Sequence, residues 1–510
     1  METKQQFRTA LRRLGAYRAD QPTRRPAFTI GLGHSWRART LGPRKREATV
    51  DRLARRGLQT LTSAQSALAT GELSSVELMR QAYDALERWN PQVNAFEHVV
   101  PREQALLECA ERDAIPSGRR GPLWGIPTTI KDVIHVAGMP TTASSETLRN
   151  YTPTEDAAAV ARLRAAGAVI IGKTTTHEYA MGVTTPHSRN PWDITRDPGG
   201  SSGGAAITLA TGMGLAALGT DTRASIRVPA ALCGTVGFKP TFGLVPTRGV
   251  VTMSWTMDHV APMARTTEDV AVLLNVLVGP DPREPTSAPR IPTDYRHFVG
   301  TEVAGLRVGI PVAGLRNADP GVLQTFQTAL AELREMGVDV VDLDQPTVED
   351  FELANAAGLI VSRCEAVLVQ NGLHGAGKRA YNQDVAEQIA EAERVHATDY
   401  LEAQRFRGDL AERMARLFNR VDALVLPTSR VVAPRLEESD QYLLVLSENC
   451  VPWSFIGFPA MSVPCGLTAG LTVGLELVAA PYDEGVLLAL GSAVEDALDM
   501  PVLPTAPSAS

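Results

Sequence analysis

A segment rich in glycine and serine is the first candidate for chemistry. Residues 198–204 read Pro-Gly-Gly-Ser-Ser-Gly-Gly, and Ser201 has the Gly-x-Ser-x-Gly spacing of a serine-hydrolase nucleophile. That motif needs a strand just upstream, whereas residues 193–198 hold two acids, an arginine and a proline. The downstream histidines lack a distinctive context: His259, His297, His374 and His396. A Ser-His-Asp triad is therefore disfavoured.

A lysine can replace histidine as the base for a serine nucleophile. Burial disfavours the ammonium form and lowers the pKa of a lysine toward neutrality, which makes the free amine available. Lys131 ends a predicted buried strand that contains Thr128 to Ile130. Because most lysines are exposed, Lys131 on its own is better explained as a surface residue. Only a larger pattern around it favours a catalytic role.

Such a pattern is present, and it resembles the amidase signature family. Its core extends over about residues 121–270, and the resemblance as a whole covers about residues 58–495. The matching segments are residues 125–132, 198–204, 219–229, 233–234, 237–241, 258–269, 422–428 and 457–466.

The resemblance implies a Ser, cis-Ser and Lys triad without metal or organic cofactor. Ser225 is then the nucleophile, and Ser201, which follows a cis peptide bond after Gly200, passes its proton to neutral Lys131. An oxyanion hole is expected from backbone amides, with Ser202 and Asp221 in support: those of Thr222, Arg223, Ala224 and Ser225.

Two departures from the family pattern affect the expected function. The family usually has Gly-Gly before the nucleophile, where this chain has Arg223-Ala224. Arg223 then points outward, binds an anionic substrate group such as a carboxylate, or impairs the hole. The link over residues 182–191 is short, and Val133 stands where the tRNA-dependent amidotransferase subunits have asparagine. These differences favour a stand-alone hydrolase.

The predicted activity is hydrolysis of a carbon–nitrogen bond in an amide, or of a carbamate (a urethanase activity) or an ester, through an acyl-enzyme. The alternative is a partner-dependent amide-hydrolysing subunit of an aminoacyl-tRNA amidotransferase. We expect a small-molecule amide or carbamate substrate and no nucleic acid, with a homodimer as one option for assembly. Trp255 and Trp453 are candidates for substrate contact, although core packing explains each equally well.

The elements that must position these residues follow from hydrophobic patterning. Helices are predicted over residues 61–88 and 154–166, and residues 349–394 form a peripheral helical layer. Residues 167–174 match the spacing of a phosphate-binding loop, but a β-branched run lies between the two glycines, so a buried strand is predicted. Repeated helix-then-strand units predict one large α/β domain, with a mixed, mostly parallel sheet between helical layers.

Composition sets the boundaries of that domain. Residues 1–57 hold 15 Lys and Arg against 4 Asp and Glu, within a chain of net charge -7, and are expected to form a poorly ordered basic extension. The catalytic domain then spans residues 58–495, and residues 496–510 form a loose tail. Five widely spaced cysteines indicate a reducing, cytoplasmic setting. Two uncharged windows, residues 198–220 and 449–475, are too short or too rich in proline to span a membrane.

Overall fold

Eleven strands form one continuous sheet in the computed structural model, which describes residues 2–20, 59–290, 292–374 and 380–498. From one edge of the sheet to the other, the strands are β1 (Phe96–Val99), β3 (Val169–Thr174), β2 (Pro127–Lys131), β4 (Ala216–Asp221), β6 (His259–Ala264), β5 (Val236–Lys239), β10 (Ala460–Thr468), β11 (Leu471–Val478), β9 (Ala423–Pro427), β7 (Arg307–Pro311) and β8 (Asp339–Leu343).

The predicted mixed sheet is confirmed, although antiparallel pairs outnumber parallel ones by six to four among the described strands. Parallel pairs join β3, β2 and β4 near one end and β9, β7 and β8 at the other. The centre is antiparallel, with a hairpin between β10 and β11. Ala469 and Gly470 have positive φ angles of 50° and 77°, the geometry that a two-residue hairpin turn requires.

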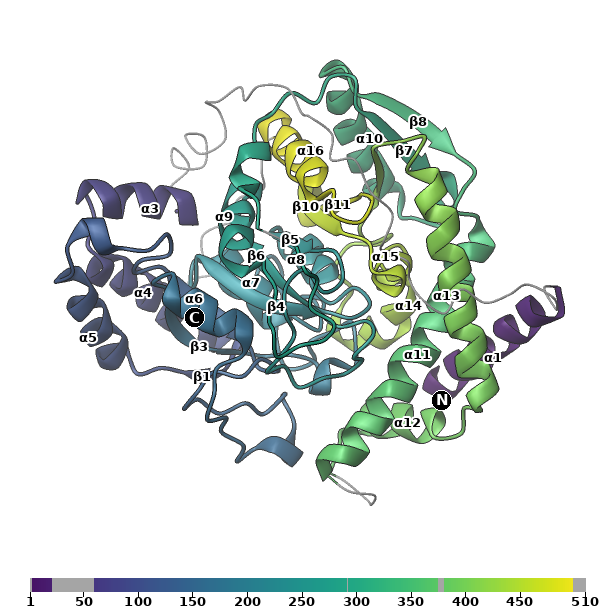
Figure 1. Ribbon diagram of the computed structural model, residues 1–510, viewed down its shortest axis with the longest axis horizontal. Coiled ribbons are helices and arrows are strands. Elements are labelled where there is room, and N and C mark those ends of the chain that lie inside the picture. Colours follow the sequence, from purple (N-terminus) through teal and green to yellow (C-terminus); the bar gives the residue numbers. More distant parts are fainter. Residues whose placement is uncertain (1, 21–58, 291, 375–379, 499–510) are drawn as a thin grey trace.

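Helices cover both faces of the sheet (Figure 1). Successive strand residues face opposite sides, so Leu218 packs in one core cluster and Ala217 in another. The cluster of Leu218 includes residues of α3 (Leu61–Thr70), α6 (Ala158–Ala165), α9 (Thr267–Leu277), α10 (Pro320–Glu335) and α16 (Glu484–Ala497). The opposite face is covered by α4 (Ser75–Val93), α5 (Arg102–Asp113), α7 (Gly203–Thr211), α8 (Arg227–Cys233), α11 (Val348–His374), α13 (Ala397–Leu417) and α15 (Val451–Ile456).

Local sequence signals explain where several elements begin. Ser74 caps α4, since its hydroxyl accepts the amide of Glu77 and the Glu77 carboxylate accepts the amide of Ser74. The two helices predicted within residues 61–88 are α3 and α4. The helix predicted over residues 154–166 begins later, at Ala158. β3 occupies the false phosphate-loop match, which confirms the prediction of a buried strand there.

The outer helices include one that departs from expectation. Among the outer helices are α12 (Gln383–Ala392), α14 (Leu443–Ser447) and, unexpectedly, α1 (Glu2–Asp20). Its buried face contacts α11, α12 and α13 (Figure 1) through Phe7, Ala10, Leu14 and Tyr17. Residues 2–20 are thus a packed helix where a poorly ordered extension was expected. Residues 21–58, the rest of that extension, and 499–510 lie outside the described residues.

A search of the described residues finds no helix with the length and apolar character needed to cross a membrane. The two uncharged windows instead belong to the catalytic domain. Residues 203–221 hold α7 and β4, and residues 451–478 hold α15 and the β10–β11 hairpin.

Candidate active site

Two neighbouring parallel strands position the candidate catalytic residues. Lys131 is the last residue of β2, and β4, its parallel neighbour, ends at Asp221. Parallel strands end at the same edge of a sheet, so Lys131 lies beside the loop that follows β4 and carries Ser225. The segment that enters α7 brings Ser201 to the same place.

Lys131 is fully buried and contacts two hydroxyl groups. Its Nζ donates to Ser201 Oγ at 2.7 Å and to Thr220 Oγ1 at 2.9 Å. Burial lowers the pKa of Lys131 to about 7, against the opposing effect of the Asp221 and Asp258 carboxylates. Near neutral pH, a large fraction of this amine is therefore unprotonated and able to accept a proton.

The turn that carries Ser201 depends on glycine. The Gly200–Ser201 peptide bond is cis, as predicted from the family resemblance. A Cβ atom on Gly200 would come within 2.0 Å of the Thr184 carbonyl oxygen, so no larger residue fits there. Thr185 Oγ1 donates to the Gly199 carbonyl at 2.8 Å and fixes the same turn from the side.

Ser225 lies between β4 and α8 and is connected to the Ser201 turn by backbone. The Ser202 amide donates to the Ser225 carbonyl at 3.0 Å, and the Ser202 hydroxyl donates to the Thr220 carbonyl at 3.2 Å. Within the described residues, no hydrogen bond joins the hydroxyls of Ser201 and Ser225. The structure thus places Lys131 and Ser201 in direct contact and holds Ser225 on an adjoining loop.

A buried ion-pair network fixes that loop. Arg227 Nε donates to Asp221 Oδ2 at 3.0 Å, and the Arg227 guanidinium also pairs with Glu476 and donates to Ser454 Oγ at 2.6 Å. Burial alone would raise the pKa of Asp221, but Arg227 outweighs it and lowers that pKa to about 2. Asp221 Oδ2 also accepts the Ile226 amide at 3.3 Å, so its charge anchors both ends of the loop.

The four predicted oxyanion-hole amides lie between the end of β4 and the start of α8. They belong to Thr222, Arg223, Ala224 and Ser225, and they are outside the hydrogen-bonding pattern of both elements. Thr222 Oγ1 donates to Asp258 Oδ1 at 2.6 Å, which holds the first of these residues in place. Burial raises the pKa of Asp258 to about 6.

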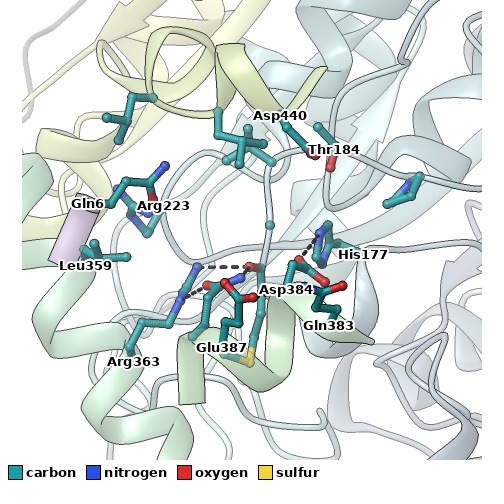
Figure 2. Close-up of a pocket in the computed structure, with 17 residues that line it drawn as sticks. Gln6, His177, Thr184, Arg223, Leu359, Arg363, Gln383, Asp384, Glu387 and Asp440 are labelled. Carbon is teal, nitrogen blue, oxygen red and sulfur yellow. Dashed lines mark hydrogen bonds and ion pairs between the residues drawn. The ribbon is translucent and has the colours of Figure 1, made fainter. Parts of the chain in front are cut away.

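A cavity of about 460 Å³ opens beside this loop (Figure 2). Arg223 lines it, together with residues 181–184 and residues of α1, α11, α12 and α14. The two tryptophans proposed for substrate contact do not line it. Trp255 is 42% exposed, and Trp453 is fully buried in edge-to-face contact with Phe351. Trp453 is therefore a core residue.

Several residues of the site were not found by sequence reasoning. Thr220 precedes Asp221 by one position and has no motif of its own, and Asp258 and Arg227 belong to the matching segments without an assigned role. Arg363, in α11, has no sequence signal at all. Within the parts of the chain that the structure describes, no group of three or more His, Cys, Asp or Glu side chains is arranged to hold a metal ion.

Comparison with known proteins identifies the relatives of this chain. The A subunit of glutamyl-tRNA(Gln) amidotransferase from Chloroflexus aurantiacus is 39% identical over 470 residues, which is 86% of this chain and 96% of that protein. A chain of a solved vestigial protein complex, described as revealing the evolutionary origins of an s-triazine catabolic enzyme, has a TM-score of 0.80 at 29% identity; the match covers 86% of this chain and 98% of that chain. The corresponding amidotransferase protein from Thermotoga maritima has a TM-score of 0.72 at 28% identity, covering 88% and 98%.

These relatives correct the expectation about partners. From the sequence we expect a small-molecule substrate and no nucleic acid, with a second copy of the chain as one option for a partner. That prediction is wrong, because the curated relatives are named as one subunit of a larger enzyme that acts on glutamyl-tRNA(Gln).

The Amidase family profile matches residues 77–488, which include every candidate catalytic residue. The matching region also contains all eleven described strands. The chain belongs to the amidase family and is a hydrolase of carbon–nitrogen bonds in amides.

Proposed function

We propose that this chain is the amide-hydrolysing subunit of an amidotransferase complex, with Ser225 as its nucleophile. The observation that carries the catalytic part is the buried contact of 2.7 Å between Lys131 Nζ and Ser201 Oγ. A lysine that is half neutral near pH 7 and bonded to a hydroxyl is suited to act as a general base. Hydrolysis of carbamates or esters by this chain remains a prediction from the sequence.

The reaction follows from these positions. Ser225 Oγ attacks the amide carbon while its proton passes to Ser201 Oγ, whose own proton passes to Lys131 Nζ. The oxyanion that forms is stabilised by the backbone amides of residues 222–225. When the carbon–nitrogen bond breaks, the proton returns through Ser201 to the departing nitrogen, which leaves as ammonia or an amine. Water then attacks the acyl-enzyme by the same proton route and releases the acid.

The proton route requires Ser201 and Ser225 to come within hydrogen-bond reach during the reaction. The hydrogen bond from the Ser202 amide to the Ser225 carbonyl supports this. It joins the two loops one residue away from Ser201. The Asp221–Arg227 pair acts by positioning, since it anchors the loop and contacts neither serine hydroxyl.

The subunit part of the proposal rests on the relatives. Identity of 39% extends over 86% of this chain, and it includes the segments that hold the candidate triad. Two of the compared proteins are also described as part of an assembly. In this proposal the amide nitrogen released at Ser225 is delivered to a partner that uses it, in a cytoplasmic enzyme.

Complementation tests the subunit proposal. The chain is added to a glutamyl-tRNA(Gln) amidotransferase from which its own amide-hydrolysing subunit has been removed, with glutamine as the amide donor. We expect amide-dependent formation of glutaminyl-tRNA, and we expect glutamine hydrolysis to exceed that of the isolated chain by at least about tenfold. A Ser225→Ala chain is the matched control. Full glutaminase activity of the isolated chain, with no glutaminyl-tRNA formed, would contradict the proposal.

A further inference from the structure

The cavity beside the nucleophile loop is lined by two buried arginines from distant parts of the chain. Arg223 comes from the nucleophile loop and is 8% exposed, and Arg363 comes from α11 and is 4% exposed. Figure 2 shows both on the left of the cavity, with the His177–Asp384 pair on the right. Arg223 contributes to a lowered pKa of Arg363, because like charges repel.

Neither arginine forms an ion pair with a carboxylate among the described residues. Among the residues that the structure describes, the Arg223 guanidinium reaches only the Asn355 carbonyl, at 3.5 Å, and its Nε has no partner. Arg363 donates to Gln388 Oε1 at 2.5 Å and to the Met181 carbonyl at 3.0 Å, both uncharged acceptors. Arg227, an equally buried arginine nearby, is by contrast neutralised by Asp221 and Glu476.

An unneutralised pair of buried cations favours an anion in the same cavity. Burial lowers the pKa of Arg223 to about 10, and burial together with Arg223 lowers that of Arg363 to about 9, so both keep their charge at neutral pH. Removing two guanidinium groups from water is costly unless a counter-charge is present. Gln6 of α1 lines the same cavity, and its Nε2 is a buried donor that has no partner within the described part of the chain.

Acidic residues also line the cavity, and they are more exposed than the two arginines. The Asp384 side chain is 49% exposed, pairs with His177 at 3.2 Å and acts on the charge of Arg363. Asp440 is exposed and Glu387 is half-buried. Water screens these exposed charges more than it screens the two arginines. The two buried guanidiniums therefore favour an anion, and the acidic residues disfavour one with more than a single negative charge.

The arginine pair is connected to the reacting groups through neighbouring residues of the chain, although Lys131, Ser201 and Ser225 do not themselves line the cavity. Arg223 precedes Ser225 by two residues, and Thr184, another lining residue, lies directly against Gly200 in the turn that carries Ser201. A short substrate would therefore be able to bind the two guanidiniums with one group while Ser225 attacks a bond elsewhere in the same molecule.

We propose that Arg223 and Arg363, with Gln6 as a further donor, form a subsite for the carboxylate of a short amide substrate. The inference rests on the proposed function, since it assigns the cavity to the substrate of Ser225. Two guanidiniums in a dry cavity bind a carboxylate by charge-assisted hydrogen bonds, and they discriminate against an uncharged chain of the same length.

Direct binding tests the subsite without requiring turnover. Calorimetry on the Ser225→Ala chain compares glutaramate, which carries one carboxylate, with pentanamide, its uncharged counterpart. We expect glutaramate to bind more than about tenfold more tightly, as hydrogen bonds to charged groups predict. Equal affinities, or no binding of glutaramate, would overturn the subsite. Selective binding by Ser225→Ala, with no hydrolysis by the unmodified chain in the complemented amidotransferase, would sustain the subsite and contradict the proposed hydrolysis.

Substitutions then test which side chains supply the positive charge that binds the carboxylate. In the Ser225→Ala background, Arg223→Met and Arg363→Met should each lower glutaramate affinity at least about tenfold more than pentanamide affinity. Arg407→Met is the matched control, because Arg407 is equally buried, donates to the Thr256 carbonyl at 2.6 Å and does not line the cavity. Arg407→Met should change the ratio of glutaramate affinity to pentanamide affinity by less than about twofold. The same loss in all three variants would overturn the assignment, and the unsubstituted comparison remains decisive should one variant fail to fold.

Discussion

The surroundings of Lys131 set the pH at which this site can work. Its hydrogen bonds go to two hydroxyls and none to a carboxylate, and burial lowers its pKa to about 7. Because the neutral amine is the base, we expect kcat/KM for a simple amide to be low well below pH 7, to rise through about pH 7 and then to level off. Initial rates measured from about pH 5 to about pH 9 give this profile.

A second buried lysine provides the control for that profile. Burial also lowers the pKa of Lys239 to about 7, but its Nζ donates to the Phe458 carbonyl at 2.5 Å and contacts neither candidate serine. Lys131→Met should abolish activity, whereas Lys239→Met should keep a rise near pH 7. If the rise moved or vanished in Lys239→Met, Lys131 would not be the group that titrates.

The nucleophile is tested by removing single hydroxyls. Ser225→Ala should lower kcat by about a thousandfold or more, and Ser201→Ala should cost a similar factor because the proton route is interrupted. Ser462→Ala is a suitable control, since its buried hydroxyl contacts Thr428 Oγ1 at 2.8 Å and is hydrogen-bonded to neither candidate serine among the described residues. Steady-state rates on one amide compare the three variants. An active Ser225→Ala enzyme would rule out this assignment.

At the scale of elements, the sequence locates the site where motif and topology coincide. Lys131 and Asp221 end two parallel strands, so the segments that resemble the family meet at one sheet edge. Arg363 could not be predicted in the same way. It lies 140 positions after Arg223, in a long helix whose apolar pattern says nothing about which polar residue faces a cavity. Only the packing of α11 against the nucleophile loop brings the two together.

Helix α1 is different, because its signal is present in the sequence but outweighed by composition. Phe7, Ala10, Leu14 and Tyr17 are spaced as one face of a helix, and all four are buried. The many arginines of residues 1–57 favoured a solvated extension instead. The centre of the sheet differs from α1, because its strand pairing has no local signal in the sequence. Its antiparallel pairs depend on contacts between distant strands, such as β4 with β6, which local patterns do not specify.

If α1 is part of the folded domain, its buried face must contribute to stability. Leu14→Ala removes a fully buried side chain and should lower the free energy of unfolding by about 2–5 kcal/mol, provided that α1 unfolds together with the domain. Arg8→Ala, on the exposed face of the same helix, should change it by less than about 0.5 kcal/mol. Urea unfolding measures both. Equal stabilities would show that α1 does not pack as described.

For the molecule as a whole, the buried carboxylates make stability depend on pH. Burial raises the pKa of Glu495 to about 8. A carboxyl whose pKa is raised by folding stays protonated in the folded chain at a pH where the unfolded chain has released its proton. Such groups stabilise the fold below their unfolded pKa and weaken it as the pH rises.

Glu495 isolates this effect because it joins two helices from distant parts of the chain. Its Oε1, near the end of α16, accepts the amide and the hydroxyl of Thr267 at the start of α9, at 2.7 Å and 2.8 Å. Between its ordinary value of 4.5 and about 8, wild-type stability should fall by up to about 1.4 kcal/mol per pH unit relative to Glu495→Gln, which keeps the acceptor and cannot ionise. Unfolding free energies at several pH values give the difference. Glu412→Gln, an exposed site on α13, is the control and should follow the wild type; a Glu495→Gln curve parallel to the wild type would contradict a protonated, buried Glu495.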